Sequence, residues 1–145
     1  MRVPFSELVL AFEFVSASNF DEHQAFLCKE TGEFFWESEA ADMDELPDDI
    51  EDDTKYVAIP HKRDLDLGKP LVLDFVREFL PNDFDEVRYI FSRKGAYAKF
   101  KALLARRSAL DRWYAFEEQA TERALKEWCD LHSIELEKST LDLQK

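Results

Sequence analysis

The chain has 145 residues, with 32 acidic and 19 basic side chains and a formal net charge of -13. This length is typical of one domain, and the acidic balance argues against a protein that coats nucleic acid, which would be basic. Because 46% of the residues are hydrophobic and 14% are aromatic, the chain can bury enough apolar surface to offset the entropy of folding, which argues against intrinsic disorder. We expect a single domain over residues 1–145.

The first part of the chain predicts a helix followed by a small sheet. Apolar residues recur at helical spacing over residues 4–18, which predicts an N-terminal helix. Residues 23–37 contain two strand-like runs, and Gly32 lies in the turn between them, so they predict a β-hairpin. A third strand is expected over residues 56–59, because Pro60 ends the run.

The pattern then becomes helical. Apolar stripes predict three consecutive helices, of which the first ends before Pro81 and the third follows Gly95. Between the first and the third of these helices, Asp83 and Glu86 have the spacing of a capping box, which predicts the start of the second helix.

A longer helix is expected over residues 109–132, followed by a short segment at 134–136 and a polar tail at about 138–145. The predicted fold class is therefore α+β. It has an N-terminal helix, a small antiparallel sheet of about three strands with helices on one face, and about four C-terminal helices.

Negative charge is concentrated in one segment. From Glu30 to Asp53 there are twelve acids and no base, and the rest of the chain has 20 acids and 19 bases. An acidic loop is expected over residues 38–55. An EF-hand calcium loop starting at Asp42 fits poorly, because Pro47 occupies its glycine position. The alternatives are a solvated loop and a surface for a basic partner, including mimicry of nucleic acid.

Positive charge is concentrated in a second segment. Between Arg88 and Arg112 there are eight bases and one acid. Three interpretations are open: long side chains that flank a buried helical stripe, a surface that contacts phosphate groups, and a docking site for the acidic loop of the same chain. The candidate anion- or partner-binding residues are Arg93, Lys94, Lys99, Lys101, Arg106 and Arg107.

No catalytic, cofactor or metal motif is present. The chain has three glycines, too few for a dinucleotide-binding or P-loop sequence, and it lacks the common zinc-binding patterns. The best local cluster is His61 with Asp64 and Asp66. Capping of the following helix by one of the two aspartates is the favoured interpretation, and metal or acid–base chemistry is the alternative.

Glu117 breaks the apolar pattern of the last helix, since it projects from the centre of the stripe that contains Leu110 and Trp113. A buried carboxylate needs a cation or hydrogen-bond donors. We expect Arg106, Arg107 or a tyrosine hydroxyl to supply them. A structural ion pair is favoured over a functional carboxylate in a cleft.

The setting predicted for the chain is cytoplasmic, without a membrane contact. No apolar run approaches the roughly 18 residues of a membrane span, and no signal peptide is evident. Cys28 and Cys129 do not form a disulfide framework, and we expect both to be inert packing thiols. Leu10 and Phe14 lie on the second face of the first helix, which weakly indicates self-association; the oligomeric state stays open.

Short motifs that follow one another in a fixed order cover most of the chain, from about Leu8 to Ile134, and together they resemble those of a known family. The chain resembles an uncharacterised family of small, mostly bacterial proteins of unknown function. That resemblance implies a bacterial cytoplasmic setting and supplies no activity, substrate or catalytic residue. The motifs are Thr31-Gly32-Glu33, Trp36-Glu37, Leu46-Pro47, Ile59-Pro60-His61, Asp64-Leu65-Asp66, Gly95-Ala96-Tyr97, Phe100-Lys101, Trp113-Tyr114-Ala115-Phe116-Glu117 and Glu127-Trp128-Cys129.

The leading hypothesis is a non-enzymatic binding or regulatory domain that acts through separate acidic (30–53) and basic (88–112) surfaces. An unidentified protein is the favoured partner, and no cofactor is expected. One alternative is an enzyme whose site combines Glu117, His61, Asp64 and Asp66. The other is nucleic-acid contact through the basic helices.

Overall fold

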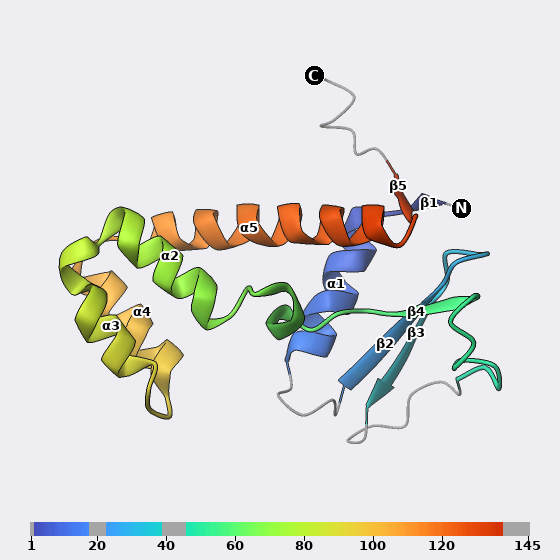
Figure 1. Ribbon diagram of the computed structural model, residues 1–145, viewed down its shortest axis with the longest axis horizontal. Coiled ribbons are helices and arrows are strands. Elements are labelled where there is room, and N and C mark those ends of the chain that lie inside the picture. The colour runs from blue at the N-terminus through green and yellow to red at the C-terminus, as the bar shows by residue number, and fades with distance from the viewer. Residues whose placement is uncertain (1, 18–22, 39–45, 138–145) are drawn as a thin grey trace. The chain divides into compact units, whose positions relative to one another are not determined.

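The computed structural model describes residues 2–17, 23–38 and 46–137 (Figure 1). It confirms the α+β class, with an N-terminal helix, a three-stranded antiparallel sheet and then the C-terminal helices. In chain order the elements are β1 (Arg2–Val3), α1 (Phe5–Ser16), β2 (His23–Cys28), β3 (Phe34–Ser38), β4 (Tyr56–Ala58), the 3-10 turn η1 (Lys62–Leu65), α2 (Lys69–Phe79), the 3-10 turn η2 (Pro81–Asp83), α3 (Phe84–Ile90), α4 (Ala96–Arg106), α5 (Leu110–Leu131) and β5 (Glu135–Leu136).

The chain divides into two compact units. Unit 1 comprises Met1–Leu65 with Lys126–Lys145, and unit 2 comprises Asp66–Leu125. Each unit has buried apolar residues of its own. The single domain predicted over residues 1–145 stays a prediction. The predicted polar tail lies outside the described residues.

The sheet of unit 1 contains the predicted hairpin and third strand. Its strand order is β3-β2-β4, and both neighbours pair antiparallel to β2, with Phe26 opposite Phe35 and Leu27 opposite Val57. The turn of the hairpin places Gly32 at φ 78, a left-handed conformation that glycine adopts without steric cost. The Gly32 N–H donates to the carbonyl of Cys28 at 2.8 Å, which closes the turn.

Helix α1 packs on one face of this sheet (Figure 1). It buries a stripe at helical spacing, as the sequence predicts, and Ala25 and Leu27 of β2 are buried as well. Phe14 lies on a second face of α1, where its ring contacts Trp36 edge-on at 5.1 Å and His23 at 4.8 Å. Phe14 is therefore packed against the sheet of the same chain, whereas Leu10 stays 59% exposed.

The two ends of unit 1 form a second, two-stranded sheet that the sequence does not predict. Strands β1 and β5 pair in parallel, with Val3 opposite Leu136 (Figure 1). Beyond β5, the Glu137 N–H donates to the carbonyl of Val3 at 2.8 Å. Val3 is fully buried, and Ile134, just before β5, is 5% exposed. Two short strands that are far apart in the sequence thus pair with each other beside buried apolar side chains.

Unit 2 is built around aromatic side chains. The Trp113 ring of α5 meets Phe75 of α2 and Phe100 of α4, each at 5.2 Å between ring centroids and nearly edge-on. These arrangements are favoured because the positive edge of one ring faces the negative face of another. Trp113 is 1% exposed, and both phenylalanines are fully buried. The helical stripes of the sequence therefore converge on one core.

The prediction that Asp64 or Asp66 caps α2 is wrong. The N-cap residue of α2 is Gly68, and no side chain caps the helix. The Asp64 carboxylate instead accepts the His61 backbone N–H at 3.1 Å, within the η1 turn. Asp66 has φ 56, so the chain turns in a left-handed conformation between η1 and α2. This turn separates both carboxylates from the first N–H groups of the helix.

Asp83 occupies the N-cap position of α3, but it forms no side-chain capping bond. Its carboxylate accepts two hydrogen bonds from one guanidinium instead, from Arg107 Nε at 3.0 Å and from Arg107 Nη2 at 2.9 Å. Asp83 is 8% exposed. Nearby, Arg106 and Glu86 approach to 3.7 Å. Bidentate, charge-assisted bonds are stronger than a neutral cap, so the distant arginine displaces the capping box.

We predict that Asp83→Asn lowers the free energy of unfolding by about 1–3 kcal/mol, because an amide cannot accept both guanidinium bonds. Urea denaturation measures this change. The matched control is Asp74→Asn, which removes an exposed partner of Arg77 and should leave stability almost unchanged. Equal effects of the two substitutions would contradict a special role for Asp83.

The same pair sets a pH dependence. The hydrogen bonds from Arg107 hold the pKa of Asp83 below its ordinary value, although burial opposes the shift. A depressed folded-state pKa stabilises the fold above the ordinary pKa, and that stabilisation is lost as the pH falls through the lowered pKa. The stability difference between the native chain and Asp83→Asn should therefore shrink below about pH 4. A difference that stays constant down to strong acid would refute this.

Candidate functional site: two charged surfaces

The first candidate is an acidic surface of unit 1 formed by the hairpin turn and residues 46–55. The Lys29 N–H donates to the Lys55 carbonyl at 2.7 Å, and Lys29 Nζ donates to the carbonyl of Asp53 at 2.8 Å. These bonds hold the turn beside the loop. We define the acidic surface by its exposed carboxylate residues, Glu30, Asp48, Asp49, Glu51 and Asp53.

The described part of the acidic loop is ordered by its own polar groups. Asp52 Oδ1 accepts the Thr54 backbone N–H at 2.9 Å and the Thr54 hydroxyl at 2.6 Å. Lys55 Nζ pairs with Asp49 Oδ2 at 3.1 Å. Hydrogen bonds from Thr54 and Lys55 respectively lower the pKa values of Asp52 and Asp49. Both carboxylates therefore stay charged even in mildly acidic solution.

Part of the predicted acidic segment lies outside the described residues. This holds for Glu39, Asp42, Asp44 and Glu45, and so for the calcium-loop pattern that begins at Asp42. Residues 46–55, which are described, form turns without a helix or strand. The predicted loop is confirmed over that stretch.

Aromatic rings border the acidic surface on the sheet face opposite α1. Trp36 points toward α1, so its neighbour Phe35 points to the other face, because side chains alternate along a strand. There Phe35 meets Tyr56 nearly edge-on, at 6.0 Å between centroids. Burial, and then a hydrogen bond with Asp49, raises the pKa of the Tyr56 hydroxyl. This ring therefore links the aromatic face to the acidic loop.

The second candidate is the basic segment of unit 2, where the six predicted residues divide into two groups. Arg107 and Arg106 pair with Asp83 and Glu86 and so hold α4 to the segment before it. Lys101 lies over the Tyr114 ring at 5.9 Å, and Arg93 lies over the Tyr89 ring at 5.0 Å.

The remaining two predicted residues, Lys94 and Lys99, are both exposed. Neither forms an ion pair within the described residues. Their charges are therefore not neutralised by a neighbouring acid, in contrast to those of Arg106 and Arg107.

Helices α3 and α4 run antiparallel, which fixes where these bases lie. The start of α3 meets the end of α4 through Glu86 and Arg106, and Phe91, just after α3, contacts Tyr97 at 5.0 Å near the start of α4. Lys99 lies about two turns before Arg106 on the same face of α4. At its Arg106 end, this face of α4 meets α3 at Glu86, which lies one turn before Tyr89. We call Tyr89, Arg93, Lys94 and Lys99 the basic patch.

Sequence reasoning does not single out Tyr89, which is 60% exposed. The sequence does place Tyr89 four residues before Arg93, a spacing that brings two side chains together on a helix. A spacing alone does not show whether the ring is buried, so the exposed surface of Tyr89 emerges only in the folded unit.

The proposed enzymatic residues divide between the two units. His61 and Asp64 belong to unit 1, and Asp66 and Glu117 belong to unit 2. His61 is 4% exposed, and its Nδ1 accepts the Arg63 backbone N–H at 3.0 Å. Asp64 accepts the His61 backbone N–H. Among the described residues, no group of three or more His, Cys, Asp or Glu side chains could hold a metal ion.

Glu117 is half-buried on α5. Of the partners expected for it, Arg106 and Arg107 are paired with other acids. The tyrosine is Tyr97 of α4: its pKa is raised by burial and then by the negative charge of Glu117. Glu117 therefore lies near a tyrosine hydroxyl within unit 2.

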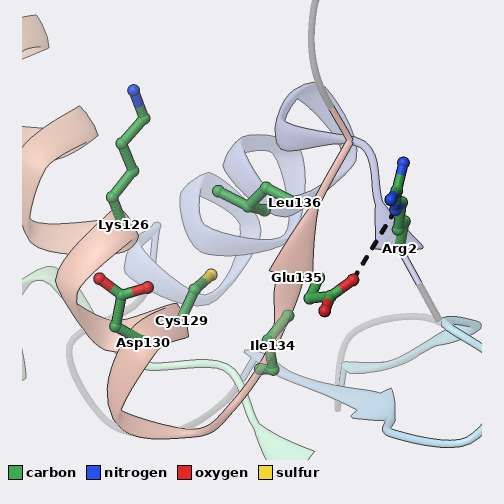
Figure 2. Close-up of a pocket in the computed structure, with 7 residues that line it drawn as sticks. All are labelled: Arg2, Lys126, Cys129, Asp130, Ile134, Glu135 and Leu136. Atoms are coloured by element: carbon green, nitrogen blue, oxygen red, sulfur yellow. Dashed lines mark ion pairs between the residues drawn. The ribbon is translucent and has the colours of Figure 1, made fainter.

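A shallow hollow of about 500 Å³ lies in unit 1 beside β5 (Figure 2). Arg2 and Glu135 approach to 3.7 Å on one side of it, while the ammonium of Lys126 points away from them. Burial, and then the charge of Asp130, raises the pKa of Cys129 to about 11. The charged groups around the hollow do not converge on one point. It is lined by Arg2, Lys126, Cys129, Asp130, Ile134, Glu135 and Leu136.

Comparison with known proteins gives no match: no family model, no curated protein and no solved structure is similar to this chain. The resemblance to an uncharacterised bacterial family therefore stays a prediction. No helix in the described ranges is long and apolar enough to cross a membrane.

The two buried cysteines should differ in reactivity. At Cys28, burial alone would raise the pKa, but hydrogen bonds from Thr31 and Glu30 outweigh it and lower the pKa. Cys129 has its pKa raised to about 11. The thiolate is the nucleophile, so iodoacetamide at pH 8 should modify Cys28 at least roughly tenfold faster than Cys129.

Peptide mapping by mass spectrometry measures the two rates on the folded chain. Cys28→Ser is the control, and it should leave the slow modification of Cys129 unchanged. Faster modification of Cys129 than of Cys28 would contradict the prediction.

Proposed function

We propose that this protein is a non-enzymatic binding module whose acidic surface binds a basic polypeptide segment. The observation that carries the proposal is the separation of charge between the units. Unit 1 has 22 acids and 8 bases, whereas unit 2 has 10 acids and 11 bases. The charge of the chain is thus a property of one unit, where it can attract and orient a cationic partner.

The bases within the acidic surface support the proposal, because both are used internally. Lys29 Nζ donates to the backbone of Asp53, and Lys55 Nζ pairs with Asp49. Asp48, Glu51 and Asp53 are exposed, and their carboxylates form no ion pair in the described part of unit 1. The lysines hold the loop in place and leave most of its negative charge for a partner.

The chemistry of the surface indicates what the partner contains. A single exposed ion pair contributes little to binding, so several lysines or arginines must act together. The rings of Phe35 and Tyr56 can contact the aliphatic stems or the charged heads of such side chains. We expect a segment with several bases, and we expect the protein to act in the cytoplasm, where its two free cysteines stay reduced.

The test is fluorescence anisotropy with a labelled synthetic peptide of alternating lysine and glycine. Binding should be strongest at low ionic strength and should fall as salt is added. Asp48→Asn/Glu51→Gln/Asp53→Asn should weaken it about tenfold, because three exposed charges are removed from the surface.

The matched control is Glu78→Gln/Asp85→Asn/Glu118→Gln, which removes the same charge from exposed positions of unit 2. It should change the affinity by less than about twofold. Absence of binding at low salt would refute the proposal. Equal weakening by both triple variants would also refute it, because net charge rather than the acidic surface would then control binding.

A further inference from the structure

We infer that the basic patch of unit 2 binds single-stranded nucleic acid, with one base stacked on Tyr89 and the phosphates held by Arg93, Lys94 and Lys99. This site lies in a different unit from the acidic surface. A failure of the function proposed above would therefore leave this inference intact, and the reverse is also true.

The first observation is the exposure of Tyr89. The central rings of unit 2, those of Phe75, Phe100 and Trp113, are buried against one another, whereas Tyr89 is 60% exposed. The Arg93 guanidinium lies over one face of the Tyr89 ring at 5.0 Å. Because the guanidinium lies over one face and Tyr89 is 60% exposed, we take the opposite face as the one that a base would meet. An open aromatic face beside a cation is the arrangement on which unpaired bases stack.

The second observation is the unneutralised positive charge around that ring. Two acids lie one turn before Tyr89 on α3: Arg106 pairs with Glu86, and the exposed Asp85 is outnumbered by Arg93, Lys94 and Lys99. Lys94 and Lys99 are exposed and have no acidic partner in the described part of the chain. Because α3 and α4 run antiparallel and Arg106 meets Glu86, helix geometry places Lys99, two turns before Arg106, toward the end of α3 that Arg93 and Lys94 follow. These side chains can contact successive phosphates.

The ring distinguishes single strands from other anions. A duplex keeps its bases stacked inside, so it would use the lysines and leave the Tyr89 face without a partner. An acidic polypeptide would pair with the same lysines but offers no flat base to the ring. The net charge of -13 does not oppose the proposal, since the bases of unit 2 outnumber its acids, at 11 to 10.

The experiment measures binding of the full chain to labelled single-stranded oligo-dT by fluorescence anisotropy. Tyr89→Ala should weaken binding at least about fivefold, whereas Tyr89→Phe should stay within about twofold, because it keeps the stacking face. The control Tyr114→Ala removes a second tyrosine that has a cation over its ring and should have little effect. Circular dichroism checks that each variant is folded.

Charge is tested separately with Lys94→Gln/Lys99→Gln. This variant should reduce the slope of log affinity against log salt by about 1.4, the value for two phosphate contacts on a single strand. Lys69→Gln/Arg123→Gln removes the same charge from other exposed positions of unit 2 and should leave the slope unchanged.

Four outcomes would overturn the inference: no binding of oligo-dT at low salt, native affinity in Tyr89→Ala, equal affinity for duplex DNA, or equally strong binding of poly-glutamate. The last result would identify the patch as a general site for acidic polypeptides.

Discussion

The bidentate pair between Asp83 and Arg107 is the constraint on which the arrangement of unit 2 depends. It joins the turn before α3 to the end of α4 through two bonds of 3.0 and 2.9 Å. Beside it, Glu86 and Arg106 meet, and at the opposite end of the two helices Phe91 packs on Tyr97. An antiparallel pair of helices follows. Some bases of α4 are thereby used to hold the fold, and the others are left on its surface.

Charge therefore has two roles in this molecule, and the role depends on what each side chain faces. Arg106 and Arg107 face acids, whereas Lys99 does not. In unit 1 the proportions are reversed: Lys29 and Lys55 are used to order a loop whose carboxylates outnumber them. In both units, a few contacts between opposite charges fix the position of a charged segment. This arrangement keeps a charged surface in place without neutralising it, which is what a binding surface requires.

Most of the secondary structure could be predicted because its signals are local. The apolar stripes of α1, α2 and α5 and the glycine turn of the hairpin depend on residues a few positions apart. The predicted caps failed for a complementary reason. Asp83 had a suitable position beside the start of α3, but a guanidinium 24 residues away offered stronger bonds. Strand β1 was missed because two residues carry no periodicity, and its partner comes from the far end of the chain.

The sequence by itself determined the α+β class, the order of the helices and of the three strands of the larger sheet, and the positions of the acidic and basic segments. Each of these depends on composition and short-range periodicity. Only the tertiary structure decided which charges are used internally, that Phe14 is covered by Trp36, and that Tyr89 is exposed beside Arg93. These features depend on ion pairs and ring contacts whose energies are set by distance and burial. Folding brings such partners together from separate elements, and no local sequence pattern predicts which of them will come into contact.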